Sequence, residues 1–543
     1  MRQKLLTLTM ATAILAACSS VDLQPTNQYD QSYGVSTAAN TELYLNSFYP
    51  IIRNFGQFGS YALGGTNSNM SDGLTDILKY SSIVAGTGDC NLIMTIEGQQ
   101  SVSQNYFDSW TTCYGWIRRI NEFLSALEND SPLPAEEKER YRAEALFFRG
   151  YCYHLIMRNH ASAKDDLGAI LYTDIKDMTA AGKNRARADV STSWDQVYDD
   201  LNYACLHLPE PAQAQGRIDK YAAEAITARA MLYAGRYSIA KDLCTDIIDN
   251  GGYDLADNET ILKYDFQKVN LVHLYDARYA SPGDVCESGS YGGGRAGPTQ
   301  EFVDMFDNAD GSPFDITNVA RRFITNDNVA SRDPRLAKAV LWNGAEWKGR
   351  AMELYENGVD MKYFPYGASK EPGNSVTGYY IRKNLQEDNF DYVRDGSWTP
   401  WIECRLAEVL LIRAECLASE DDWTGAFNDV NTLRKARFGR DDVITQPINS
   451  WDTALDVILH ERAVEFCFEG HRFWDLRRTG RAREVLDGKK YNGVLWKKSG
   501  TTFTAELASC EMGARIYPER FDRFPIPQSE ISNNTLAKQN SDW

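Results

Sequence analysis

Three side chains near the C-terminal end of the chain combine the residue types of acid–base chemistry within a short span. Glu469, His471 and Asp475 could supply an acid, a base and a carboxylate that orients the base. However, Glu469 and Asp475 each stand three residues before an arginine, Arg472 and Arg478. On a helix this spacing forms ordinary ion pairs that contribute about 0.2–0.5 kcal/mol each. We therefore interpret the trio as charges paired along a helix and not as a catalytic centre.

The rest of the sequence shows no familiar catalytic motif. Neither a nucleophile elbow nor a His-Glu-x-x-His pattern occurs, and the 6 histidines are spread thinly along the chain. The aromatic residues around the trio fit the buried face of the same helix: Phe466, Phe468, Phe473 and Trp474. A glycosidase could still use two carboxylates from distant positions, an alternative that spacing alone leaves open.

A glycine-rich run at Gly292–Gly297 contains the G-x-G-x-x-G spacing of dinucleotide-binding loops. That motif needs a strand before it and a helix after it. Here no apolar strand precedes the run, and Pro298 follows at once. We interpret the run as a flexible loop beside Tyr291, with a ligand-contacting loop as the alternative, and we expect no cofactor.

Aromatic residues outside the clear helical patterns are the best candidates for ligand binding. Sugars place their C–H faces against flat rings, and one ring can cover on the order of 150–250 Å². Trp342 and Trp347 are the strongest pair, because Gly344 between them predicts a turn able to present both rings. The other candidates are Tyr291, Tyr80 and Trp398 as platforms, and Asn69, Asp72 and Arg350 as polar partners. For each, a place in a local core or a solvated charge is the alternative.

Long helices must position these candidates. Over 134–159, apolar residues such as Tyr141 and Phe148 recur at three- and four-residue steps, which predicts one long helix with a buried face. Pro134 and the two glutamates behind it suit the first turn and the positive end of the helix dipole. A second helix is expected from about Trp194 to Leu208, before a proline.

An internal repeat is visible when the sequence is shifted by 186 residues. The stretch with Ala228, Ala230 and Tyr237 then meets the stretch with Ala414, Cys416 and Trp423. Both stretches predict a helix, a tight turn with an aromatic residue and a second helix. This pattern resembles the tetratricopeptide helix pair, in which small residues lie where the helices cross.

Between the helical blocks, roughly over 254–400, helical periodicity fades while Gly, Pro, Asn, Asp and aromatics become frequent. We expect loops and short strands there. A long irregular stretch with many aromatics is more typical of a binding surface than of a linker. We therefore predict a ligand-binding part at 266–400 between two helical parts, at 46–265 and 401–543.

The first residues are typical of an export signal. Two basic residues precede an apolar run over 5–15, which is too short to span a bilayer because spanning takes roughly 20 residues. Leu15-Ala16-Ala17-Cys18 resembles a lipobox, so we expect residues 1–17 to be removed and Cys18 to carry the lipid. Residues 18–45 would form a lipidated tether. An ordinary signal peptide with a coincidental cysteine is the alternative.

The charge balance and the cysteine spacing argue against some classes of partner and of metal site. The chain has 75 Asp plus Glu against 57 Lys plus Arg, which argues against nucleic acid as a partner. The 11 cysteines lack the spacing of a zinc site. We expect Cys152, Cys244, Cys416 and Cys467, which fall in helix-like patterns, to be buried free thiols, although an occasional disulfide stays open.

The segment 458–480, ILHERAVEFCFEGHRFWDLRRTG, closely resembles the C-terminal signature of the SusD/RagB family of Bacteroidetes outer-membrane lipoproteins. The resemblance spans nearly the whole mature chain. It extends to residues 143–158, to 407–416, to the closing FPIPQSEI at 524–531, and to the spacing of Trp110, Tyr114, Ile117 and Asn121.

The resemblance implies a mainly α-helical protein in which several tetratricopeptide-like pairs pack against an irregular, loop-rich part with short strands. It also implies a cell-surface lipoprotein that binds oligosaccharides or similar nutrients and delivers them to a SusC-like TonB-dependent transporter, without covalent chemistry. A surface glycoside hydrolase and a tetratricopeptide-type interaction scaffold are the alternatives. Bound calcium stays open, because Asp and Asn are abundant in the irregular part without EF-hand spacing.

Overall fold

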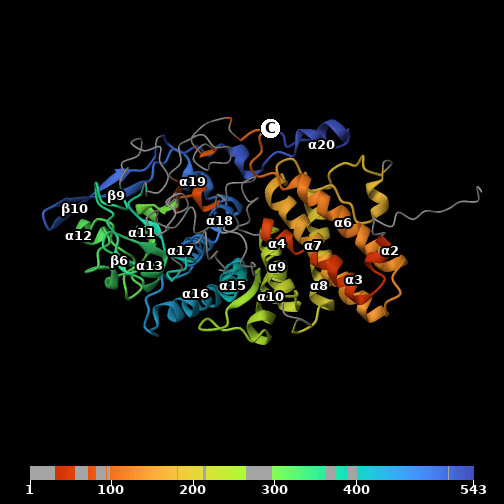
Figure 1. Ribbon diagram of the computed structural model, residues 1–543, viewed down its shortest axis with the longest axis horizontal. Helices are drawn as coiled ribbons and strands as arrows, with labels where there is room; N and C mark the ends of the chain where they lie inside the picture. The colour runs from red at the N-terminus through yellow and green to blue at the C-terminus, as the bar shows by residue number, and fades with distance from the viewer. Residues whose placement is uncertain are drawn as a thin grey trace, which may run out of the picture.

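The structure, a computed structural model, describes residues 31–55, 71–80, 93–94, 98, 100–179, 182–211, 216–264, 296–361, 375, 377–388, 400–511 and 513–543. Long helices occupy one end of the molecule, and short strands, short helices and turns occupy the other (Figure 1). This is the mainly helical, loop-rich architecture that the sequence predicts.

The N-terminal part is a series of helices in which each packs on the next around one hydrophobic core. Its elements are α2 (Gln31–Gly34), α3 (Ala38–Asn46), α4 (Pro50–Phe55), α6 (Trp110–Asn129), α7 (Ala135–His160), η2 (Ile175–Met178), α8 (Val190–His207), α9 (Lys220–Tyr233) and α10 (Tyr237–Asn250). Helix α7 confirms the helix expected over 134–159 and is buried on nearly every side from Tyr141 onward, because α6 and α8 both pack against it. Helix α8 begins at Val190, earlier than expected, because the Asp189 side chain caps it by accepting the Thr192 N–H.

The 186-residue repeat is confirmed at the level of whole helices. Helices α9 and α10 begin at residues 220 and 237, and α15 (Leu406–Ser419) and α16 (Trp423–Phe438) begin at 406 and 423. The small residues Ala228, Ala230, Ala414 and Cys416 are fully buried. Helix α10 packs on both α9 and α15, so the two related pairs are neighbours.

The predicted tether is too long. Helix α2 and all but the last residue of α3 lie within 18–45, and Val35, Thr41 and Leu45 are fully buried against the N-terminal helices. The error arose because this short segment is polar on average, and a few buried side chains are enough to dock it.

The irregular part contains short two-stranded antiparallel sheets around a second core, except that the buried residues of β2 and β8 belong to the core of the N-terminal helices. The pairs are β1 (Leu78–Tyr80) with β3 (Ala296–Pro298), β2 (Thr260–Tyr264) with β8 (Trp401–Arg405), β4 (Val340–Leu341) with β7 (Tyr380–Ile381), and β5 (Glu346–Trp347) with β6 (Arg350–Ala351). Short helices lie between them: η1 (Ser71–Leu74), α11 (Gln300–Met305), α12 (Val319–Arg322), η5 (Val329–Ser331) and α13 (Pro334–Ala339).

The C-terminal part is less helical than expected. It adds α17 (Trp451–Glu465), α18 (Arg472–Arg478), α19 (Ala482–Leu486), η6 (Glu519–Asp522) and α20 (Gln528–Asn533). It also holds the longest strands described, β9 (Asn492–Ser499) and β10 (Thr502–Ser509), whose hairpin projects at the end of the molecule away from α2 (Figure 1).

The last residues return to the N-terminal helices. The Phe524 N–H donates to the carbonyl of Asn159 over 2.9 Å, and the His160 ring lies 2.9 Å from the carbonyl of Pro525. Arg187 donates to the side chain of Asn540 over 2.7 Å. The C-terminus therefore lies beside α20 and over the N-terminal helices (Figure 1).

The four thiols predicted to be buried and free, at Cys152, Cys244, Cys416 and Cys467, are all so in the structure. Among the helices described, none combines the length and the apolar character needed to cross a bilayer.

Candidate functional site

The signature segment does not form the single helix that its charge spacing suggested. Helix α17 ends at Glu465, α18 begins at Arg472, and the chain turns between them through Phe468 (φ 63°) and Gly470 (φ 77°). Both residues adopt the left-handed region, which ends a helix and favours glycine. The aromatics predicted as core are confirmed, since Phe466, Phe468, Phe473 and Trp474 are buried.

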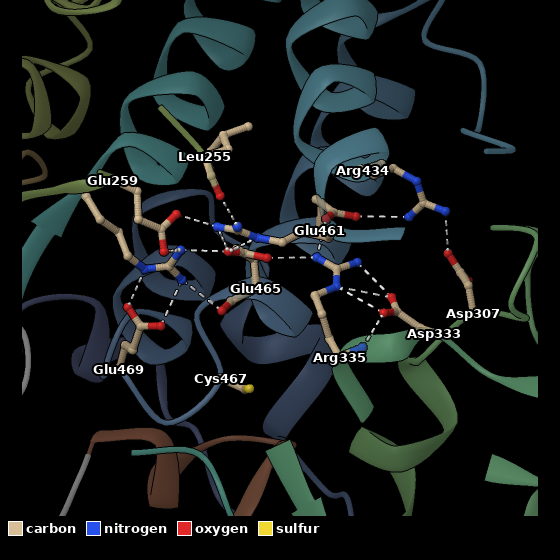
Figure 2. A network of polar contacts seen from close by, with 12 residues as sticks. Leu255, Glu259, Asp307, Asp333, Arg335, Arg434, Glu461, Glu465, Cys467 and Glu469 are labelled. Atoms are coloured by element: carbon tan, nitrogen blue, oxygen red, sulfur yellow. Dashed lines mark hydrogen bonds and ion pairs between the residues drawn. The ribbon is translucent and has the colours of Figure 1, made fainter. Parts of the chain in front are cut away.

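Helix α17 carries the acidic half of a buried ion network (Figure 2). Glu465 accepts from Arg335 of α13 over 2.9 Å, from Arg405 at the end of β8 over 2.6 Å, and from Arg437 of α16 over 2.8 Å. One turn earlier, Glu461 binds Arg335 at 2.5 Å and Arg434 at 2.9 Å. The signature thus ties the tetratricopeptide-like pair α15–α16 to the irregular part.

The charge partners of the acid–base trio differ from those predicted. Glu469 pairs with Lys383 and Arg405, at 2.6 and 2.8 Å, and not with Arg472. Arg472 instead reaches Asp76 at 2.8 Å. The turn at Phe468 and Gly470 removes the helical spacing on which the prediction relied.

Asp475 does pair with Arg478, over 2.9 Å, as expected, and it also pairs with Arg462 over 2.7 Å. His471 lies 3.9 Å from Glu408 and 3.4 Å from the guanidinium of Arg462. Arg462 is therefore a neighbour of both Asp475 and His471, whereas Glu469 is paired with Lys383 and Arg405.

Electrostatics keep Glu469 and His471 each in one protonation state near neutral pH. Burial by itself would raise the pKa of Glu469, but Arg405 and Lys383 hold that pKa at about 2. Burial lowers the pKa of His471 to about 4, despite the opposing charge of Glu408. A carboxylate that stays ionised and an imidazole that stays neutral are suited to structural roles.

Two buried histidines should therefore make the stability of the protein depend on pH above the usual titration range of carboxylates. Burial lowers the pKa of His160 to about 3 and that of His471 to about 4, against about 6.5 in an unfolded chain. Below about pH 6.5 the unfolded chain protonates these two imidazoles and the folded chain does not, so their contribution to stability falls until the folded pKa values are reached. Asp72 and Glu224 act in the opposite sense, because burial raises their pKa values to about 7 and about 8 in the folded chain. Urea unfolding between pH 7.5 and 4.5 should show this loss, and His471→Gln should flatten the slope. If the variant showed the same slope as the wild type, His471 would not be a source of this pH dependence.

The turn in the signature also positions the segment 71–80. The Ser71 hydroxyl donates to the carbonyl of Gly470 over 3.0 Å, and the Gly470 N–H donates to the Asp72 carboxylate over 3.1 Å. Asp72, a predicted ligand contact, is fully buried, and burial raises its pKa to about 7 against the opposing Gly470 N–H. In this conformation the Asp72 carboxylate faces the signature turn, and its role as a ligand contact stays a prediction.

Two tryptophans expected as an exposed platform lie in the second core. The predicted turn exists, with Gly344 at φ 87°, but Trp342 is 6% exposed and Trp347 is 0% exposed. The Trp342 ring N–H donates to Asn326 over 2.8 Å. The prediction that this turn presents both rings outward is wrong, because both rings pack in the second core.

The structure describes only some of the other predicted site residues. Arg350 is half-buried and binds both oxygens of Asp360, at 2.7 and 2.9 Å. Tyr80 pairs with Ala296 through the backbone, while its side chain lies outside the described residues. The remaining candidates, Cys18, Asn69, Tyr291 and Trp398, also lie outside them, and so do most of the glycine-rich run and all of 265–295. The ligand-binding roles of Tyr80, Tyr291, Asn69 and Arg350 and the lipidation of Cys18 stay predictions.

Sequence reasoning missed a surface pocket of about 600 Å³ beside α20. One wall is formed by residues 102–106 and Asp108, just before α6, and the other by Pro527, Gln528 and Ser529. The FPIPQSEI stretch at 524–531 contributes one wall of this pocket, but in the sequence it indicated only the family resemblance.

Comparisons with known proteins agree with this architecture. A family model described as "SusD family" matches residues 258–543, and one described as "Starch-binding associating with outer membrane" matches residues 36–232. "SusD-like protein P25" of Formosa agariphila is 24% identical over 455 residues, which cover 82% of this chain and 83% of the relative. "Starch-binding protein SusD" of Bacteroides thetaiotaomicron is 24% identical over 552 residues, which cover 89% and 91%.

Solved structures show the same fold. A SusD-like protein from Bacteroides fragilis superposes with a TM-score of 0.78 at 24% identity, over 95% of this chain and 99% of that one. A structure described as "Laminarin binding SusD-like protein" superposes with a TM-score of 0.61 at 19% identity, over 94% and 100%. With one family model covering more than half of the chain and a second covering most of the N-terminal helices, this protein belongs to the SusD family.

Proposed function

We propose that this protein is a cell-surface glycan-binding lipoprotein that captures oligosaccharides and delivers them to a SusC-like TonB-dependent transporter of the outer membrane. The main support is the family match along both halves of the chain, together with relatives and structural neighbours whose names record starch, laminarin or carbohydrate binding. The resemblance of residues 15–18 to a lipobox supports the lipid anchor.

We further propose that the protein acts without covalent chemistry. The observation that carries this proposal is the geometry of the signature, in which Glu469 and Asp475 are bound by basic side chains and His471 is buried. A general acid needs a proton to give near neutral pH. The low pKa of Glu469 leaves it none.

Purified protein should bind at least one oligosaccharide class and release no product from it. A glycan array that spans plant, algal and host polysaccharides would find the class, and titration calorimetry would give its affinity. Reducing ends followed for a day, with a commercial glycanase as the positive control, should stay at the level of the blank. Product release that persists after repurification would instead support a surface glycoside hydrolase.

Cys18→Ala should abolish lipid attachment. Cells that express the wild type or the variant would be labelled with palmitate and fractionated, and the label should follow the wild type into the outer membrane. Cys152→Ala is a matched control, because that thiol is buried in α7. Equal labelling of wild type and Cys18→Ala would mean that residues 1–17 are an ordinary signal peptide.

A further inference from the structure

The pocket beside α20 is built from two segments that lie far apart in the sequence but are fastened together. The Asn105 side chain donates to the carbonyl of Pro525 over 2.9 Å. Behind the pocket, the rings of Phe107 and Phe524 stack with centroids 3.9 Å apart and planes within 3°. The carbonyl of Pro525 also meets the ring of His160, from α7. The two walls are therefore held in place before any ligand arrives, as is usual for small-molecule sites.

The lining of this pocket combines a small apolar floor with a neutral polar rim. Tyr106 and Pro527 line the pocket but are largely buried, Val102 is partly exposed, and Gln104, Gln528 and Ser529 are exposed. Asp108 adds one partly exposed carboxylate, which accepts the Thr111 N–H at the start of α6. Amides and hydroxyls can both donate and accept hydrogen bonds, and the carboxylate accepts them.

We propose that this pocket is a second saccharide subsite, which binds a short neutral segment of the glycan chain. A pyranose presents hydroxyls that suit the amides and Asp108, and its C–H faces suit the partly exposed side chain of Val102. The inference rests on the proposed function, since it assumes that the protein binds glycans. It concerns a place apart from the irregular part that holds Trp342, Trp347 and Arg350 (Figure 1).

Other ligand classes fit this lining less well. None of its side chains is basic, so an anionic ligand would meet only Asp108 as a charge. A protein partner usually anchors on exposed aromatic or large aliphatic side chains. The exposed large apolar residues of the described chain, which include Phe503, Leu507 and Leu536, are not among those that line the pocket.

The test compares wild type with a Gln104→Ala/Gln528→Ala double variant. Both side chains are exposed and bond only locally, to Tyr106 and Ser532, so folding should be unaffected. Asp108→Asn is a second variant that keeps an acceptor for the Thr111 N–H. Gln446→Ala is the matched control, because Gln446 is an exposed amide outside the pocket. The probes are maltohexaose, laminarihexaose and the strongest ligand from the glycan array.

The double variant should bind these oligosaccharides about tenfold more weakly than wild type, since two hydrogen-bonding amides are lost, while Gln446→Ala matches wild type. Thermal melts should coincide for all the proteins. Wild-type affinity in both pocket variants would overturn the second subsite and leave the proposed function standing. The same conclusion would follow if the variants bound saccharides normally but no longer bound the transporter. Failure of the wild type to bind any probe would overturn both.

Discussion

Arg335→Ala should destabilise the folded protein by about 3–5 kcal/mol, because it leaves buried carboxylates without one of their counter-charges. Arg335 binds Asp333 at 2.7 Å, Glu461 at 2.5 Å and Glu465 at 2.9 Å, and all of these carboxylates are nearly inaccessible to water. Removing one member of a buried ion network destabilises a protein by more than the intact network stabilises it relative to an apolar core. Chemical denaturation followed by circular dichroism would measure the loss.

Two variants sharpen the measurement for Arg335. Arg335→Lys should recover only part of the stability, because an ammonium keeps the charge but not the planar fork that serves several carboxylates. Arg440→Ala should change nothing measurable, since Arg440 pairs with the exposed Asp442 on the surface. A loss for Arg335→Ala as small as that for Arg440→Ala would show that the network does not hold the two parts together.

Trp347→Ala should lower stability by about 3–5 kcal/mol, as for other large aromatic side chains removed from a core, while the remaining folded molecules bind glycan with wild-type affinity. The ring is fully buried in the second core, near Lys348 and Arg382. Glu346→Ala, one residue earlier in the same strand and exposed, is the matched control. Thermal melts combined with titration calorimetry separate stability from affinity. Wild-type stability together with lost binding would make Trp347 a ligand platform after all.

Features that depend on local periodicity could be predicted from the sequence. The long helix α7 and the related pairs α9–α10 and α15–α16 follow from apolar and small residues at helical spacing. The burial of Phe466 and Trp474 follows for the same reason. Such patterns repeat within one or two helical turns, so they can be recognised from the sequence of the segment itself.

Features that depend on distant partners could not be predicted in this way. Arg335 and Glu461 are 126 positions apart, and no spacing rule connects them. Gly344 does indicate a turn, but the side to which Trp342 and Trp347 point depends on the core that packs there. Gly470 is a local signal for the end of α17, since a glycine inside an expected helix often ends it.

The return of the C-terminal residues to the N-terminal helices sets the order in which this chain can fold. His160 and Arg187 take partners from residues 525–540, which the ribosome makes hundreds of positions later. Contacts of such high sequence separation form slowly, and until they form the first helices keep open the surface that the tail will cover. A nascent chain of this kind stays incompletely folded until its synthesis ends. That delay suits the export that we propose for this protein, and it means that products truncated near the C-terminus should be removed by proteases.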